Sequence, residues 1–170
     1  NYVDVQIGRL PVELKKRPGN RDTVIVLTSD HGWNLGEKTH WCKAAIWRDT
    51  TRVPFMVVSP GVAKAGLRNN QPISHVDIYP SLCDFAGIPK PTHLEGRSIL
   101  PLLEDPSATR DVAFLSYGPE NTAAQSERYR YLRYEDGSEE LYDHQKDPHE
   151  WTNLIGNKNY QPIRKKMRAQ

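Results

Sequence analysis

The stretch from Thr23 to Lys43 constrains the fold more than any other part of the chain. It opens with an apolar run over residues 24–27 and continues into small and ligand-type residues over 28–32. Such a run, rich in β-branched residues, is typical of a strand buried on both faces. In open parallel sheets, ligands bind beyond the carboxyl ends of the strands. We therefore expect Asp30 and His31 to border a crevice, with Gly32 giving the backbone freedom to turn there.

Composition excludes several classes of protein. The 170 residues carry 23 basic and 21 acidic side chains, a net charge of +2, which does not suggest a nucleic-acid-binding protein. No apolar run approaches the roughly 20 residues that a membrane span needs. Two cysteines, Cys42 and Cys83, do not make a disulfide framework. The chain opens on Asn1 without a signal-peptide pattern, so we expect further residues to precede it.

The order of expected elements indicates an α/β part followed by a small antiparallel sheet. We expect a helix over 2–16 that Pro11 kinks or ends, partial helical spacing over 34–51, and a helix over 74–86 that Gly87 caps. The expected strands cover residues 24–27, 55–58, 112–116, 129–134 and 139–143, with a tight hairpin over 135–138 and a basic helix over 160–170. A shift in composition near residues 104–107 divides the chain into two regions, 1–106 and 107–170.

Asp30 and His31 suit a divalent cation. A carboxylate favours a hard ion such as Ca²⁺ or Mg²⁺, whereas an imidazole leans toward zinc or iron. Two ligands do not complete any site, so others must come from elsewhere. The alternative is structural: Asp30 caps the following turn, and His31 is a polar residue whose hydrogen bonds are satisfied.

Other side chains leave similar alternatives open. Lys43, close to two tryptophans in the sequence, either binds an anion or extends past apolar surface to solvent. His40 and His75 are lone histidines, and Arg52 is a candidate ion-pair anchor. The tyrosine-rich hairpin is either a sugar-stacking surface or the apolar face of a small sheet; its members are Tyr129, Tyr131, Tyr134 and Tyr142.

Several ordered motifs together resemble the type I sulfatases of the alkaline-phosphatase-like superfamily, with the iduronate-2-sulfatase-type branch as the best match. They are TSDHGWNLGEKTHWCK (28–43), TRVPFMVVSPG (51–61), SHVDIYPSLCDFAGIP (74–89) and EGRSILPLLEDP (95–106). The opening NYVDVQIGRL and the ending over residues 126–157 fit the same enzymes. The resemblance covers nearly the whole chain, and the number of motifs makes it specific.

The resemblance implies a fold, an activity and a site. The fold is the C-terminal part of an α/β/α sandwich followed by a small antiparallel sheet with a C-terminal helix. The activity is hydrolysis of sulfate esters, here of a sulfated sugar, in a periplasmic, secreted or lysosomal enzyme. Asp30 and His31 would be two ligands of a Ca²⁺ (Mg²⁺ is the alternative), Lys43 would contact a sulfate oxygen, and His40 would touch substrate. A cation and an ammonium would neutralise charge where it develops on the transferring group.

The chain departs from the family pattern at the nucleophile. The family makes a formylglycine from the cysteine of a C-x-P-S-R motif, and neither Cys42 nor Cys83 lies in one. The paired N-terminal aspartates and the N-terminal lysine and histidine of the site are also missing. We therefore expect formylglycine on an N-terminal part of the same enzyme, and no turnover by this chain alone.

Two other functions remain open from the sequence. One is a phosphodiester or phosphonate hydrolase of the same superfamily, which shares the motif at residues 29–32. The other is a non-catalytic fragment that binds sulfated glycans through Lys43, Arg52 and the tyrosine hairpin.

Overall fold

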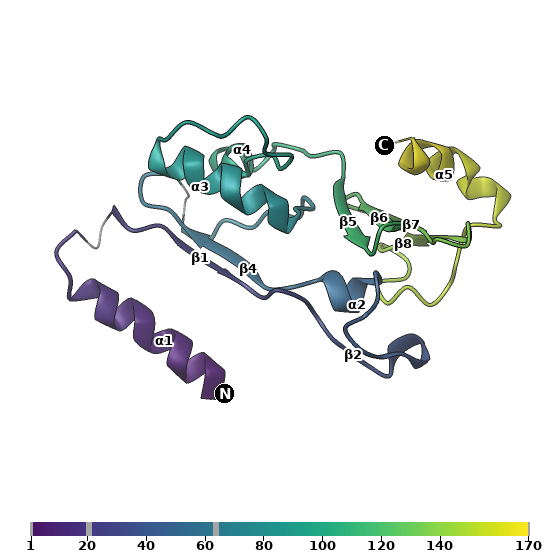
Figure 1. Ribbon diagram of the computed structural model, residues 1–170, viewed down its shortest axis with the longest axis horizontal. Helices are drawn as coiled ribbons and strands as arrows, with labels where there is room; N and C mark the ends of the chain where they lie inside the picture. The colour runs from purple at the N-terminus through teal and green to yellow at the C-terminus, as the bar shows by residue number, and fades with distance from the viewer. Residues whose placement is uncertain (1, 20–21, 63–64, 170) are drawn as a thin grey trace.

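The computed structural model of the chain describes residues 2–19, 22–62 and 65–169, and it contains three small sheets with five α-helices among them (Figure 1). The helices are α1 (Tyr2–Lys15), α2 (Arg48–Thr51), α3 (Ile78–Ala86), α4 (Leu100–Glu104) and α5 (Gln161–Arg168), with short 3-10 turns η2 (Glu37–Thr39), η3 (His75–Asp77) and η4 (Lys158–Tyr160). The strands are β1 (Ile25–Thr28), β2 (Asn34–Leu35), β3 (Trp41–Cys42), β4 (Phe55–Val58), β5 (Ala113–Tyr117), β6 (Asn121–Gln125), β7 (Tyr129–Arg133) and β8 (Glu139–Asp143).

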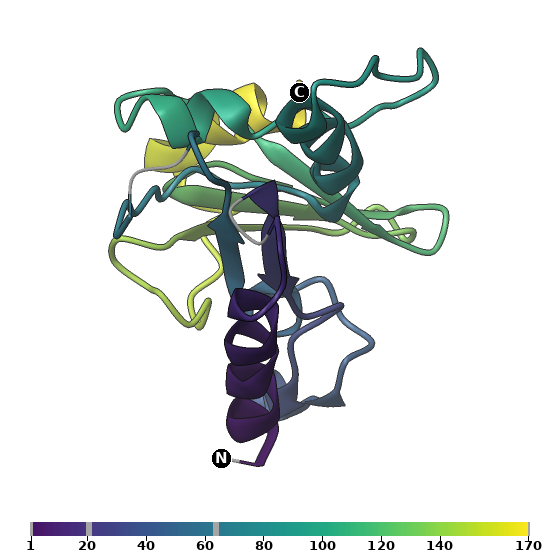
Figure 2. The same cartoon turned by 90° about the vertical axis from the view of Figure 1, so that its left-hand side faces the viewer.

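The first sheet pairs β1 with β4 antiparallel, with Ile25 opposite Val58 and Thr28 opposite Phe55. All four residues of β1 are only partly buried, and Met56 and Val58 of β4 are exposed. The expectation that β1 is buried on both faces is therefore wrong for the described residues. The reason is that the described chain gives this sheet only two strands. Helices α3 and α4 lie on one side of it, and α1, which has no buried residues, lies on the other (Figures 1 and 2).

The second half of the chain forms a four-stranded antiparallel meander, β5-β6-β7-β8, with α5 on one side of it (Figures 1 and 2). One core cluster lies on the α5 side and joins Val112, Ala124, Tyr131, Leu141 and Met167. The other cluster joins Ala123, Leu132 and Tyr142 to Ile46 of the first half. The sheet therefore buries apolar side chains on both faces, and one of these faces holds the segment that leads into α2.

Most expected elements are present, helix α4 was not expected, and three further differences follow. Helix α1 continues through Pro11 instead of ending there. The alanine-containing strand β6 was not expected, because its sequence has no apolar run; it is held by ladders on both sides, to β5 and to β7.

The partial helix expected over residues 34–51 is the third difference. Only α2 is helical there, and a β2–β3 hairpin around η2 takes up the preceding residues. Positive φ angles at Lys38 (54°), Thr39 (58°) and Cys42 (76°) are incompatible with a continuous right-handed helix.

Candidate active site

The turn that follows β1 lies directly against α2. The backbone N–H groups of Gly32 and Trp33 donate to the carbonyls of Thr50 and Asp49, at 2.8 and 3.0 Å. A Cβ on Gly32 would lie 2.0 Å from the carbonyl oxygen of Asp49, where no real Cβ fits. Gly32 is therefore needed because the two backbones approach each other closely. The expected reason, freedom of the backbone at a turn, does not apply, since the φ of Gly32 is not positive.

Three of the predicted site residues meet at one point. The Nζ of Lys43 lies 2.9 Å from the Nε2 of His31, and the Oδ2 of Asp30 lies 3.5 Å from the same nitrogen. Lys43 directly follows β3. The β2–β3 hairpin therefore brings Lys43 back to the end of β1. The side chain of Asp30 is 83% exposed and that of His31 is 31% exposed, so the group faces solvent.

Hydrogen bonds fix how His31 presents its ring. Its Nδ1 lies 2.8 Å from the carbonyl oxygen of Gly32, which accepts only, so Nδ1 carries the proton. This leaves the lone pair of Nε2 free to accept from Lys43 or to bind a cation, as in metal-ligating histidines held by a backbone carbonyl.

Asp30 divides its two carboxylate oxygens between the turn and the His31 ring. Its Oδ1 accepts from the backbone N–H of His31 at 3.1 Å, which is the expected structural role in the turn. Its Oδ2 faces the His31 ring. Slight desolvation raises the pKa of Asp30, but His31, two backbone N–H groups and Lys43 together lower it below its ordinary value, so the carboxylate stays ionised.

These residues fit part of a cation site. The Asp30 carboxylate and the Nε2 lone pair are close enough to bind one ion side by side, whereas Ca²⁺ takes six to eight ligands. Within residues 2–19, 22–62 and 65–169, no group of three or more His, Cys, Asp or Glu side chains could hold a metal ion. Asp30 and His31 could thus supply at most two ligands, and a complete cation site would need others.

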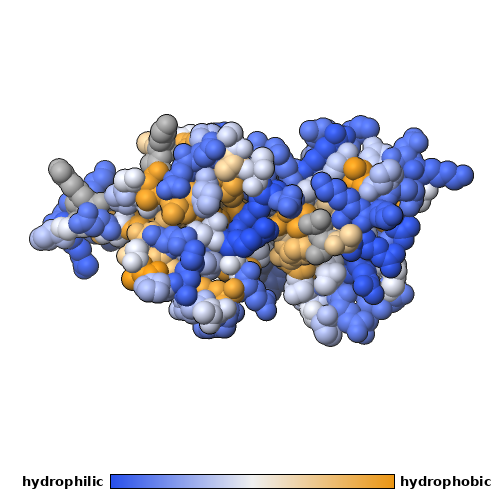
Figure 3. All heavy atoms as spheres, turned by 90° about the horizontal axis from the view of Figure 1, so that it is seen from above, coloured by the Kyte–Doolittle hydropathy of each residue, from blue (hydrophilic) through white to orange (hydrophobic). Residues whose placement is uncertain are grey.

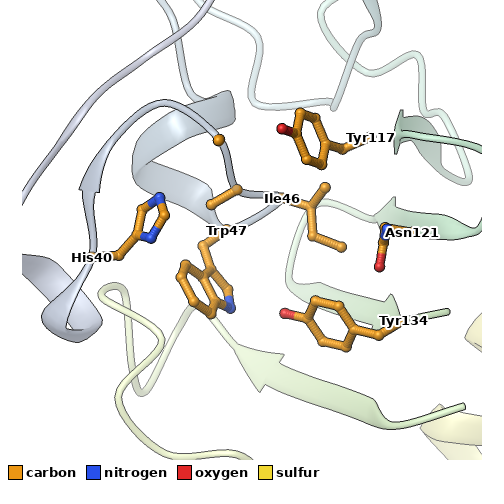
Figure 4. A pocket seen from close by; sticks show the side chains of 8 residues that line it. His40, Ile46, Trp47, Tyr117, Asn121 and Tyr134 are labelled. Carbon is orange, nitrogen blue, oxygen red and sulfur yellow. The ribbon is translucent and has the colours of Figure 1, made fainter. Parts of the chain in front are cut away.

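His40 occupies a different place from the Asp30, His31 and Lys43 group. Its ring packs edge-on against Trp47, with centroids 5.7 Å apart, and lines a pocket between the β2–β3 hairpin and the four-stranded sheet (Figure 4). The lysine that lies over a tryptophan is Lys38, with its Nζ 5.1 Å from the centre of Trp47 and 4.5 Å from that of Tyr142. Nothing in the sequence favours Lys38 over Lys43 as the lysine that contacts a tryptophan.

Asp77 is a buried junction that sequence reasoning missed. Its carboxylate accepts from the backbone N–H groups of Ser74 and Arg97, both at 2.8 Å, and pairs with Arg110 at 2.6 Å. The Ser-x-x-Asp spacing of Ser74 and Asp77 is a capping-box signal that could have identified it. Near it, the Nε2 of His75 lies 3.3 Å from the hydroxyl of Thr28, which connects η3 to the end of β1.

Glu150 is a second buried junction, and nothing in the sequence marked it. It is 1% exposed and accepts from the backbone N–H of Arg48 and from His144, at 2.9 and 2.8 Å. The Nε of Arg130 lies 3.6 Å from its carboxylate. This network fixes α2, and so the turn of Gly32, to the four-stranded sheet.

Solved structures with a similar fold indicate the class of the protein. One was determined with its substrate D-glucosamine-2-N,6-O-disulfate; it is 30% identical, has a TM-score of 0.81 and is matched over 98% of this chain and 37% of that one. The phosphonate monoester hydrolase of Agrobacterium radiobacter is also 30% identical, with a TM-score of 0.82 over 98% of this chain and 38% of that one. The neighbours include sulfatases of the alkaline-phosphatase-like fold, which confirms the fold class expected from the sequence.

The sequence places the chain in a particular family. Residues 36–170 match the family described as N-sulphoglucosamine sulphohydrolase, C-terminal, and the chain belongs to that family. A sulfatase of Formosa agariphila is 37% identical over 158 residues, which cover 92% of this chain and 31% of that protein. The chain thus spans about a third of the length of the relatives it matches. No helix among the described residues is long and apolar enough to cross a membrane.

Proposed function

We propose that the chain is the C-terminal portion of a sulfatase that hydrolyses sulfate esters of a sulfated carbohydrate. The observation that carries this proposal is the meeting of Asp30, His31 and Lys43 at the end of β1. The glucosamine disulfate bound by a structural neighbour supports a sulfated sugar as the substrate.

Each of the three residues has a role in the proposal. Asp30 and His31 would hold a Ca²⁺, or Mg²⁺ as the alternative. When bound, the cation would neutralise negative charge on the sulfate group. The Lys43 ammonium, freed from His31 by that cation, would donate to a sulfate oxygen, and His40 would contact the sugar from its pocket.

The nucleophile and the remaining ligands would come from an N-terminal part of the same enzyme. The described chain exposes apolar side chains on α1, β4 and α3, among them Val3, Leu10, Met56, Tyr79 and Leu82. In Figure 3, apolar side chains gather at the α3 end, whereas hydrophilic ones cover most of the α5 end. Surfaces of this kind mark contact with other protein. We propose that the N-terminal part covers them and carries the formylglycine.

A chimaeric enzyme tests the function. This chain would replace the matching region of the Formosa agariphila sulfatase, whose own N-terminal part stays in place. We expect release of sulfate from 4-nitrophenyl sulfate, and a loss of at least tenfold with Lys43→Ala, because an oriented donor to a developing charge is worth about 10²–10³ in rate. Exposed Lys165→Ala on α5 is the matched control. A folded chimaera without sulfate release, or one indifferent to Lys43→Ala, would overturn the proposal.

A second candidate is phosphonate or phosphodiester hydrolysis, which the Agrobacterium radiobacter neighbour favours. Rates of the chimaera on 4-nitrophenyl sulfate and on 4-nitrophenyl phenylphosphonate separate the two. A sulfatase assignment requires the sulfate ester to react faster. Faster cleavage of the phosphonate would select the second candidate.

Two finer assignments belong to the same proposal. The motifs favour the iduronate-2-sulfatase-type branch of the sulfatases. By family resemblance, the enzyme would act in the periplasm, outside the cell or in lysosomes.

A further inference from the structure

A small aromatic pocket lies between the two halves of the chain. It has a volume of about 240 Å³ and is lined from one side by His40 and Trp47, and from the sheet by Tyr117, Asn121 and Tyr134 (Figure 4). Ala44 and Ala45, which directly follow Lys43, also line it. This part of the pocket wall therefore begins one residue after Lys43, the residue proposed to contact the sulfate.

One polar atom in the pocket wall, the Nε2 of His40, is shielded from solvent and has no hydrogen-bond partner among the described residues. The hydroxyl of Tyr134 is also buried in the wall, close to Glu140 and Trp47. Burial, with the nearby carboxylate of Glu140, raises the pKa of Tyr134 well above its ordinary value, so its hydroxyl keeps its proton. Buried polar atoms without a partner are rare, and a ligand that hydrogen-bonds to them would remove the penalty.

The rim beside the pocket is acidic. A neighbouring hollow of about 410 Å³ shares Trp47, Asn121 and Tyr134 with the pocket and adds Glu135, Asp136 and Glu140. Hydrogen bonds from Ser138 lower the pKa of Asp136, so that it is ionised at neutral pH. Glu140 accepts from the indole N–H of Trp47 at 2.8 Å. A sulfate or carboxylate placed here would meet like charges.

We propose that this pocket binds an uncharged pyranose ring that adjoins the sugar carrying the sulfate ester. Three flat aromatic side chains match the apolar face of a sugar ring, and the polar atoms of His40 and Tyr134 match its hydroxyl groups. The acidic rim selects against a ring that bears sulfate or carboxylate. The inference deepens the proposed function and rests on it for the identity of the natural substrate, whereas binding by the pocket needs no sulfate site.

Nuclear magnetic resonance of the whole chain tests the proposal. The indole N–H of Trp47 is the reporter, assigned with Trp47→Phe. The probes are methyl β-D-glucopyranoside and the corresponding glucuronide, which differ only by a carboxylate in place of a hydroxymethyl group. We expect the glucoside to shift the Trp47 signal in a saturable way, and the glucuronide to bind at least about fivefold more weakly.

Variants then locate the binding. Tyr117 is exposed, so Tyr117→Ala should leave the fold intact and weaken glucoside binding about threefold to tenfold through loss of one aromatic wall. Tyr134→Phe keeps the ring and removes the hydroxyl, and it should also weaken binding. Tyr79→Ala, at an exposed tyrosine on α3, is the matched control and should change nothing.

The outcomes separate this inference from the sulfatase assignment. Asp30→Asn and Lys43→Ala should leave glucoside binding unchanged, since the pocket acts without them. No shift at Trp47 with the glucoside, equal or tighter binding of the glucuronide, or insensitivity to both tyrosine variants would overturn the inference. None of these results bears on sulfate release by the chimaera.

Discussion

At the scale of single residues, Glu150 illustrates how one buried charge can hold two parts of a chain together. Burial alone raises the pKa of this carboxylate, but the hydrogen bond from His144 and the charge of Arg130 outweigh it and lower the pKa below its ordinary value of 4.5. A buried charge with partners of this kind is stable only while the partners are present. Glu150 also lies at φ 59°, a conformation that the surrounding contacts must hold.

Glu150→Gln should destabilise the chain and change its response to acid. Because the folded pKa is depressed, the ionised carboxylate stabilises the fold above about pH 4.5, and this contribution is lost as the pH falls through the folded pKa. Removing the charge leaves Arg130 buried without its counter-ion, so we expect a loss of about 3 kcal/mol at pH 7. The free energy of unfolding in urea, measured from pH 7 to pH 3, should fall less steeply for the variant than for the parent.

Exposed Glu120→Gln is the control for that experiment and should follow the parent at every pH. If Glu150→Gln kept the stability of the parent at pH 7, the junction would not hold the halves together as described.

At the scale of elements, the turn after β1 depends on α2 for its shape. Gly32 contributes no side chain, and the absence of one lets the turn form two backbone hydrogen bonds with α2. These contacts fix the backbone that carries Asp30 and His31. The identity of residue 32 therefore decides whether the site residues meet.

Gly32→Ala should separate the turn from α2. Its Cβ would meet a backbone oxygen at 2.0 Å, which a side-chain rotation cannot relieve, so we expect a loss of about 2–4 kcal/mol in unfolding free energy, the range of large overpacking effects. Gly8→Ala is the matched control, because a Cβ there meets nothing within 4 Å and lies in α1, where alanine favours the helix by about 1 kcal/mol. Equal stability of the two variants in urea would show that the turn does not pack as described.

Elements with a clear local pattern could be predicted from the sequence. The helix ending at Gly87, the two strands around the tight hairpin and the closing helix all follow from spacing and turn residues. Elements held by tertiary contacts could not. Strand β6 has little apolar character of its own, and the β2–β3 hairpin depends on four residues with positive φ, Gly36, Lys38, Thr39 and Cys42.

The candidate site could be predicted only in part, because some of its residues have a local signal and others come together only through tertiary contacts. Asp30 and His31 follow a recognisable strand, and the motifs that resemble sulfatases pointed to Lys43. Tyr117 and Asn121 carry no local signal of a pocket, because they meet His40 and Trp47 only when the sheet folds against the first half.

At the scale of the whole molecule, the two halves are joined by polar contacts as well as by a core. Arg130 donates to the carbonyl of Ile46 and to Thr51, and Trp47 donates to Glu140. We propose a division into residues 1–106 and 107–170 as regions of one enzyme. Through these contacts the second region holds α2 in place, and α2 in turn holds the Gly32 turn. The site residues Asp30 and His31 therefore depend on the four-stranded sheet for their positions.

The central claim is that a carboxylate, an imidazole lone pair and an ammonium share one point that can receive a cation. Nitrogen chemical shifts of the His31 ring, measured in the whole chain at neutral pH during a CaCl₂ titration, test it most directly. We predict a protonated Nδ1, a bare Nε2, and a saturable Ca²⁺ shift of Nε2 in the millimolar range of weak sites, lost in Asp30→Asn and absent at exposed His93. A protonated Nε2, no Ca²⁺ response, or a response that Asp30→Asn leaves intact would contradict it.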